Sequence, residues 1–170
     1  LQCHDLIDLA IPRGGESLIR RVCSEARMPV LKHFSGNCHV YIDTTADLDM
    51  AEKILIDAKC QRMGVCNAAE SLLVHKNVAE KYLPRVAKQL QSHGVEIVGD
   101  DETCQLLAGI NRATEEDFAM EFLGPKLSVA VVRSIDEAID HINRFGSRHT
   151  DAIVTKDNAM AERFAARVDT

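Results

Sequence analysis

Short apolar segments alternate with longer segments of helical periodicity along almost the whole chain, and this alternation limits the possible folds more than any other feature. The apolar segments, which predict strands, are 6–11, 29–33, 39–42, 71–75, 95–98, 127–132 and 151–155. Segments with apolar residues three and four positions apart, which predict helices, are 15–26, 47–59, 78–93, 135–145 and 159–168. Strands that alternate with helices predict an α/β protein, a mostly parallel sheet flanked by helices.

Capping residues support several of these boundaries. Ser134 precedes the acidic pair Asp136 and Glu137, as an N-cap precedes an acidic first turn. Gly94 and Gly146 follow the last apolar turns of two predicted helices. The segment 108–118 is the least periodic, and we expect a surface loop there.

The domain organisation follows from length and from the two ends of the chain. A chain of 170 residues with 46% hydrophobic content can bury a core of one domain or slightly more. No repeat or Pro/Ser-rich linker occurs, so any border must lie in an ordered turn such as 35–37. The first residue is Leu1, an apolar segment begins almost at once, and no strand follows 159–168, so we expect a piece of a longer fold.

Composition excludes several classes of partner and site. Lys and Arg (20) are fewer than Asp and Glu (26) and form no basic cluster, which argues against nucleic acid. No apolar run reaches eighteen residues and no signal peptide is recognisable, so we expect a soluble cytoplasmic protein without membrane contact. The six cysteines form no C-x-x-C pair, and Cys38-His39 lacks further ligands, so we expect reduced thiols and no metal.

Cys66 is the first candidate for chemistry. It lies between a predicted helix and a predicted strand, two residues after Gly64, where a side chain can be exposed. A free thiol has a pKa of ~8.5, so a nucleophile at neutral pH needs a nearby cation or backbone N–H groups to stabilise its thiolate. Arg62 is such a cation, but its position equally suits a surface salt bridge. The local sequence also leaves open that Cys66 is a small buried hydrophobe, as Cys23 and Cys104 are expected to be.

The histidines are a second group of candidates. Each of His33, His39, His75 and His149 lies at or beside a predicted strand, where an imidazole is commonly held by backbone hydrogen bonds. His149, followed by Thr150, is the best candidate among them for a substrate contact.

Several blocks of sequence resemble one enzyme family. Cys66-Asn67-Ala68 and Glu70 lie in the longest such block, 58–74; the others are 8–15, 36–43 and 149–155. In order and spacing they are similar to the γ-glutamyl phosphate reductases, also called glutamate-5-semialdehyde dehydrogenases. The resemblance extends over nearly the whole chain.

A more distant resemblance links the chain to the aldehyde dehydrogenase superfamily. Gly64-Val65-Cys66 is similar to the nucleophile motif of that superfamily, and residues 121–125, Glu-Phe-Leu-Gly-Pro, to its Glu-x-Phe-Gly-Pro motif. Leu123 replaces the phenylalanine of the second motif. The resemblance therefore implies an aldehyde-dehydrogenase-like fold.

The resemblance also implies roles for individual residues. Cys66 would be the nucleophile and Asn67 would help to fix its turn. Glu121 would accept hydrogen bonds from the nicotinamide ribose, since a carboxylate offers several acceptor sites. Gly14 and Gly15, which follow a predicted strand and open a predicted helix, would line the pyrophosphate of NADP. Apart from the resemblance, the chemistry of a guanidinium makes Arg62 a candidate contact of the departing phosphate, and the position of His149 beside a strand makes it a candidate substrate contact.

One departure from the superfamily is informative. Superfamily members that hydrolyse a thioester carry a glutamate before a Gly-Gly pair upstream of the cysteine, whereas residues 30–37 here contain no carboxylate. A base that activates water is needed only when the acyl-enzyme is hydrolysed. Its absence suits a reductase.

The function that the resemblance implies is the NADPH-dependent reduction of L-glutamyl 5-phosphate to L-glutamate 5-semialdehyde through a Cys66 thioester, in proline biosynthesis. Residues 1–36 would be the end of an NADP-binding domain and 37–170 a catalytic domain. The whole enzyme would be a homo-oligomer, with functional coupling to glutamate 5-kinase. Two alternatives remain: a coenzyme A-acylating aldehyde dehydrogenase, and a non-catalytic binding or redox module in which Cys66 is one buried thiol of six.

Overall fold

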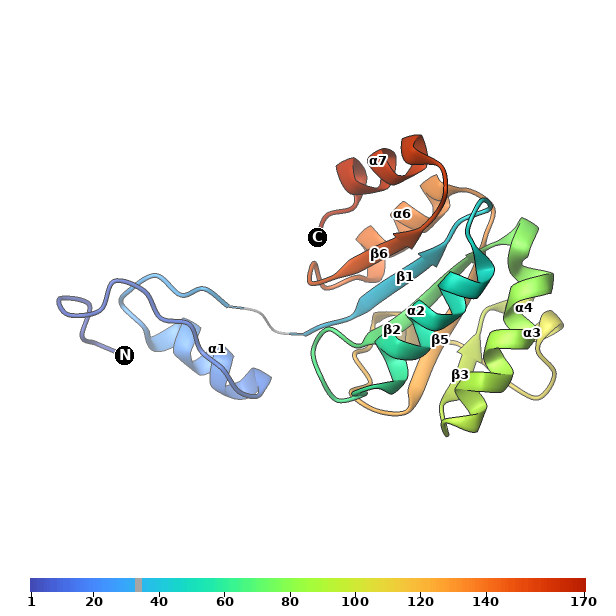
Figure 1. Cartoon of the computed structure of the whole chain (residues 1–170). Helices are drawn as coiled ribbons and strands as arrows, with labels where there is room; N and C mark the ends of the chain where they lie inside the picture. The colour runs from blue at the N-terminus through green and yellow to red at the C-terminus, as the bar shows by residue number, and fades with distance from the viewer. Residues whose placement is uncertain (33–34) are drawn as a thin grey trace. The chain divides into compact units, whose positions relative to one another are not determined.

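The chain forms two compact units, residues 1–35 and 36–170 (Figure 1). The structure is a computed structural model that describes residues 1–32 and 35–170, with Glu16 described by its backbone alone. His33, one of the candidate histidines, lies outside the described residues.

The N-terminal unit is built around one helix, α1 (Glu16–Glu25). The predicted strand 6–11 and the described part of 29–33 are reduced to a single parallel bridge between Ala10 and Val30. The prediction of two strands is wrong here because apolar side chains such as Leu6 (85% exposed) and Leu31 (61% exposed) find no core within this unit. A strand of this kind needs a packed sheet to hold it.

The larger unit is a parallel sheet of six strands. In chain order they are β1 (Cys38–Ile42), β2 (Ala69–His75), β3 (Glu96–Gly99), β4 (Asn111–Arg112), β5 (Lys126–Val132) and β6 (Asp151–Val154). Their order in the sheet is β4-β3-β5-β2-β1-β6, and every pairing is parallel. The predicted α/β class with a parallel sheet is confirmed.

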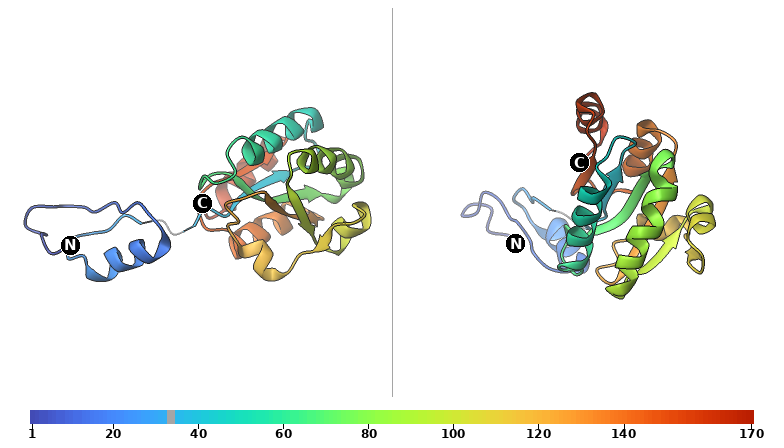
Figure 2. Two further views of the ribbon diagram at one scale, coloured as in Figure 1. Left: turned by 90° about the horizontal axis from the view of Figure 1, so that it is seen from below. Right: turned by 45° about the vertical axis from the view of Figure 1, so that its right-hand side comes forward.

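Helices cover both faces of this sheet, as Figure 2 shows. Alternate residues of each strand point to opposite faces, so Val40 and Ile42 of β1 pack on one side and Tyr41 on the other. The first side is closed by α2 (Leu48–Cys60), α3 (Lys76–Ser92) and α4 (Asp101–Leu106). The second is closed by α6 (Ile135–Phe145) and α7 (Asn158–Arg167).

The capping predictions hold in this unit. Ser134 caps α6 by accepting a hydrogen bond from the Glu137 N–H at 3.2 Å. Gly94 follows α3 with φ of +77°, a conformation that favours glycine. Helix α6 has the predicted bounds.

The segment predicted as a surface loop, 108–118, is partly ordered structure. It contains β4 and the start of α5 (Glu115–Ala119), which opens with a capping box between Thr114 and Asp117. These elements are too short to produce a visible periodicity, so a reading of apolar spacing misses them.

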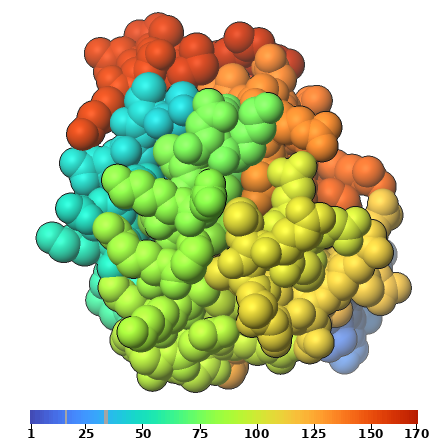
Figure 3. Space-filling model, turned by 90° about the vertical axis from the view of Figure 1, so that its right-hand side faces the viewer, coloured from blue at the N-terminus to red at the C-terminus, as the bar shows by residue number. Residues whose placement is uncertain are grey.

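In Figure 3 the segments of α3, α4 and β4, coloured green to yellow, lie side by side on one face of the molecule. The amino ends of the strands carry the loops in which the candidate residues lie. Among the described helices, none is long and apolar enough to cross a membrane.

Candidate active site

The candidate residues of the larger unit precede four strands that are neighbours in the sheet. Glu121 precedes β5, Cys66 precedes β2, Asn37 precedes β1, and His149 precedes β6, and the order of these strands is β5-β2-β1-β6. Because neighbouring parallel strands begin at the same edge of a sheet, the topology brings together residues that lie as far apart as 37 and 149 in the sequence. A candidate site therefore lies at the amino end of the sheet.

Cys66 occupies a tight turn between α2 and β2. The Ala68 N–H donates to the Val65 carbonyl at 3.0 Å, so Cys66 and Asn67 are the two central residues of this turn. The Cys66 side chain is exposed, which contradicts the alternative of a buried hydrophobe. The turn leads directly into β2, in agreement with the strand predicted after Cys66.

Gly36 lies where the Cys66 turn and the Glu121 loop meet. A Cβ atom on Gly36 would lie 1.8 Å from the carbonyl oxygen of Cys66 and 2.9 Å from Oε1 of Glu121. Only a residue without a side chain leaves room for both groups at this point. The segment of the proposed nucleophile, Cys66, and the side chain of the proposed cofactor ligand, Glu121, thus both lie next to Gly36. The sequence alone did not indicate this role of Gly36.

The loop that carries Glu121 is fixed from both sides. An ion pair spans the loop: Asp117 of α5, before Glu121, pairs with Lys126 of β5, after it, at 2.7 Å. The Lys126 ammonium also lies 5.0 Å from the centre of the Phe122 ring. After it, Leu123 has φ of +51°, which is unusual for a residue with a side chain. Among the described side chains, none donates a hydrogen bond to the Glu121 carboxylate, so its oxygens can accept from a ligand.

A second cysteine lies beside the Cys66 turn. The buried thiol of Cys38 donates to the carbonyl oxygen of Cys66 at 3.3 Å, and its Sγ lies 3.7 Å from Nδ1 of His149. Burial, together with the charge of Asp151, raises the pKa of Cys38 to about 12, so this thiol stays protonated. His149 is thereby placed next to the Cys66 turn, with its Nδ1 also 2.9 Å from the Thr150 hydroxyl.

Buried polar residues hold the strand starts in register. The Asp151 carboxylate accepts from the backbone N–H of His39 at 3.0 Å and contacts its Nδ1 at 2.9 Å. Asn37 donates through Nδ2 to the carbonyls of Phe118 and Phe145, both at 2.8 Å. His39 is therefore a structural residue. The sequence did not indicate these roles of Asn37 and Asp151, because partners that lie 81 to 112 positions apart leave no local signal.

His75 lies at the other end of the sheet. It is the N-cap of α3, and its Nδ1 accepts from the Asn77 N–H at 3.2 Å. Because β2 separates it from the Cys66 turn by a strand length of roughly 20 Å, it takes no part in the site.

Arg62 and Asn67 line a pocket on the α2 side of the Cys66 turn. The pocket has a volume of about 420 Å³, and Gln61 and Val65 also line it. Arg62 is exposed, and no carboxylate among the described residues forms an ion pair with it. The salt bridge considered for Arg62 is therefore not formed within the described chain, and its guanidinium can reach an anion.

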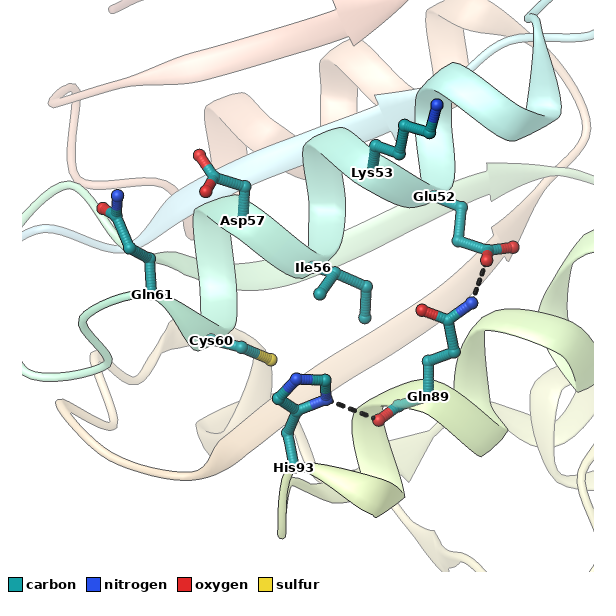
Figure 4. Close-up of a pocket in the computed structure, with 8 residues that line it drawn as sticks. All are labelled: Glu52, Lys53, Ile56, Asp57, Cys60, Gln61, Gln89 and His93. Atoms are coloured by element: carbon teal, nitrogen blue, oxygen red, sulfur yellow. Dashed lines mark hydrogen bonds between the residues drawn. The ribbon is translucent and has the colours of Figure 1, made fainter.

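A second pocket, also of about 420 Å³, lies between α2 and α3 (Figure 4). Three of its polar residues contact one another: Gln89 donates to Glu52, and Nδ1 of His93 contacts the Gln89 carbonyl at 2.9 Å. Neither Cys66 nor Glu121 lines it. The amino end of the sheet is thus the better candidate for chemistry.

Gly14 and Gly15 belong to the N-terminal unit. Gly14 has φ of +150°, and a Cβ there would lie 2.7 Å from a Leu18 side-chain carbon. Gly15 is the N-cap of α1 and has no atom within 4 Å of the place where a Cβ would be. A tight turn that leads into an unobstructed helix N-terminus is consistent with the geometry that phosphate binding requires.

The sequence and the site together define the class of protein. The profile of the aldehyde dehydrogenase family matches residues 1–120. The chain therefore belongs to the aldehyde dehydrogenase family.

Relatives within this family are more specific. The chain is 57% identical over 169 residues to the γ-glutamyl phosphate reductase of Rhodopirellula baltica and 52% identical over 169 residues to that of Geobacter metallireducens. Each match includes 99% of this chain, but only 39% of the first relative and 40% of the second. The chain thus spans about 40% of the length of the curated relatives it matches.

Solved structures agree with this placement. The crystal structure of γ-glutamyl phosphate reductase from Thermotoga maritima matches with a TM-score of 0.96 at 40% identity, over 99% of this chain and 41% of that one. A propionaldehyde dehydrogenase from Clostridium phytofermentans matches with a TM-score of 0.75 at 20% identity, over 98% of this chain and 46% of that one. The second match shows the shared fold alone.

Proposed function

We propose that the protein containing this chain reduces L-glutamyl 5-phosphate to L-glutamate 5-semialdehyde and releases phosphate, in proline biosynthesis. The names of the relatives support the substrate. The observation that carries the proposal is the meeting of the Cys66 turn and the Glu121 carboxylate at Gly36, which brings a nucleophile and a ligand for a nicotinamide ribose to one place.

In the first step Cys66 acts as the nucleophile. Its thiolate attacks the γ-carbonyl carbon, a carbon–sulfur bond forms, and the carbon–oxygen bond to phosphate breaks. Arg62 is the proposed partner of the departing phosphate, because a guanidinium matches phosphate oxygens in a bidentate arrangement. Its exposure and its lack of a described ion pair support this role.

In the second step the thioester is reduced. NADPH, when bound, would supply the hydride that the carbonyl carbon needs. Cys66 holds this carbon as a thioester and leaves as the thiolate when the carbon–sulfur bond breaks and the aldehyde is released. The backbone N–H of Cys66 is the proposed donor to the tetrahedral oxyanion, and Asn67 fixes the turn that presents it. Holding the carbonyl on Cys66 makes the hydride transfer effectively intramolecular.

Three residues are proposed as contacts of the cofactor, one in the larger unit and two in the N-terminal unit. Glu121 has carboxylate oxygens free to accept from ribose hydroxyls, and Gly14 with Gly15 would line the pyrophosphate. The choice of NADP rests on the family resemblance. His149 is proposed as a substrate contact because it lies beside Cys38 and the Cys66 turn.

The domain organisation, the cellular location and the assembly of the enzyme are also proposals. We assign residues 1–36 to the end of an NADP-binding domain and 37–170 to the catalytic domain of a cytoplasmic homo-oligomer, with functional coupling to glutamate 5-kinase. The absence of a carboxylate in 30–37 favours reduction over hydrolysis.

A full-length reductase that carries this sequence tests the proposal. Phosphate-dependent reduction of NADP⁺ with glutamate 5-semialdehyde is expected, and Cys66→Ser should slow it by more than about a thousandfold. Cys60→Ser is the control, because Cys60 is a free cysteine that lies outside the Cys66 turn, and this variant should keep near-normal turnover. Strict dependence on coenzyme A would favour the acylating alternative, and absence of turnover in every assay would favour a non-catalytic module.

A further inference from the structure

A fully buried ion pair brackets the Cys66 turn. Nζ of Lys59, in the last turn of α2, lies 2.7 Å from Oε2 of Glu70, the second residue of β2. Both side chains are 0% exposed. The residues between them form the loop that carries Cys66, so the pair closes this loop at its base.

The same carboxylate also holds the Glu121 loop. The other oxygen of Glu70, Oε1, accepts a hydrogen bond from the Leu123 N–H at 3.1 Å. Leu123 is the residue with φ of +51°, a strained conformation that persists only where its surroundings hold it. Glu121 lies two residues before this turn, so its position depends on a hydrogen bond to Glu70.

A gain in folding stability is a poor explanation for a buried ion pair such as Lys59–Glu70. Burial raises the pKa of Glu70, while Lys59 and the Leu123 N–H favour its charged form. The desolvation of two charges often cancels their attraction, and a well-packed apolar pair of similar size can be as stable. A role in fixing one arrangement of the chain is the better-attested use of a buried ion pair.

We propose that Lys59 and Glu70 are positioning residues, which set the distance between the Cys66 thiol and the Glu121 carboxylate by binding both loops to one buried carboxylate. Lys59 orients Glu70 and closes the nucleophile loop, and Glu70 holds the Leu123 turn. This inference rests on the proposed function, because it assumes that Glu121 binds the nicotinamide nucleotide.

Two double variants of the full-length reductase separate positioning from stability. Lys59→Met with Glu70→Met removes the ion pair and the acceptor for the Leu123 N–H. Lys59→Met with Glu70→Gln removes the ion pair but keeps an acceptor oxygen. Both replace the charges by groups of similar size, and melting temperatures of the two variants establish that they remain folded.

The affinity for NADPH, measured by fluorescence titration without substrate, is the readout. We expect the Met/Met variant to raise the dissociation constant about tenfold and the Met/Gln variant to raise it less than threefold. In a Glu121→Ala background the Met/Met change should have an effect below twofold, because the residue through which it acts is gone. KM for NADPH should follow the dissociation constant.

Several results would overturn the inference. If the Met/Met change lowers NADPH affinity equally with Glu121 and in the Glu121→Ala background, the ion pair has a general structural role. Equal losses of affinity in the Met/Met and Met/Gln variants would show the same. Unchanged affinity in the Met/Met variant, or an unmutated enzyme that binds no NADPH, would contradict it as well. If the Met/Met variant does not fold, the Met/Gln variant decides: a tenfold loss of affinity there contradicts the inference. An unmutated enzyme that binds NADPH but forms no semialdehyde would contradict the proposed function alone.

Discussion

The thiol of Cys38 donates a hydrogen bond to the backbone carbonyl of Cys66 at 3.3 Å. The two cysteines are thus neighbours with opposite surroundings: Cys38 is 3% exposed and Cys66 is exposed. One is a protonated donor that holds the turn, and the other is free to react. This division of roles leads to the first prediction.

Alkylation at neutral pH should modify Cys66 and leave Cys38 intact. Cys66 is accessible, whereas burial and a pKa of about 12 keep Cys38 protonated and shielded. Iodoacetamide labelling followed by peptide mass mapping measures both rates, with exposed Cys3 as the internal reference. Labelling of Cys38 at a rate similar to Cys66 would contradict the packing of this turn.

Replacement of Gly36 by alanine should reduce reductase turnover by about a hundredfold or more, because the new Cβ collides with the Cys66 carbonyl and must displace the turn. Gly64→Ala is a matched control in the Cys66 loop, since a Cβ there meets only the Leu123 carbonyl, at an ordinary 3.7 Å. Steady-state rates of both variants test this. Full activity of Gly36→Ala would show that the two loops do not meet as described.

The protein should lose stability as the pH falls below 6.5, in part through His141. Burial, with the positive charges of neighbouring groups, lowers the pKa of His141 from 6.5 to about 3 in the folded state. The unfolded chain therefore binds a proton at higher pH, and the free energy of unfolding falls by up to about 1.4 kcal/mol per pH unit between these values. Urea unfolding at pH 7 and pH 5 should show a smaller loss for His141→Leu, and an unchanged loss would contradict this account.

Asp117 should stabilise the Glu121 loop at neutral pH. The Lys126 ammonium and the Thr114 N–H lower the pKa of Asp117 from 3.8 to about 2, so its contribution is present above pH 4 and is lost as the pH falls towards 2. Asp117→Asn should cost about 1 to 2 kcal/mol at pH 7, measured by urea unfolding. Glu115→Gln is the control, since its exposed pair with Arg144 contributes at most about 1 kcal/mol. Equal costs of the two variants would contradict the prediction.

The fold could largely be predicted because its main elements are long and periodic. The helix at 135–145 has the predicted bounds, and strand 127–132 differs by one residue, since buried apolar residues fix both. The strands expected at 6–11 and 29–33 were wrong, because apolar composition alone does not supply a partner strand.

The site could be predicted only in part. The family resemblance identified Cys66 and Glu121, whereas Gly36, Cys38 and the Glu70 carboxylate gain their roles from contacts across the fold. In the sequence, Glu70 appeared only as part of the block 58–74 that resembles the family. Its hydrogen bond to Leu123, 53 positions away, could not be predicted.

The central claim is that Cys66 carries the acyl group, and a trapped thioester tests it most directly. A full-length reductase carrying this sequence is mixed with glutamate 5-semialdehyde and NADP⁺ in the absence of phosphate, quenched in acid and analysed by peptide mass spectrometry. The account predicts a γ-glutamyl adduct on the peptide that contains Cys66, which disappears when phosphate is added. An adduct on another cysteine, or reduction of NADP⁺ to completion with no adduct on Cys66, would contradict it.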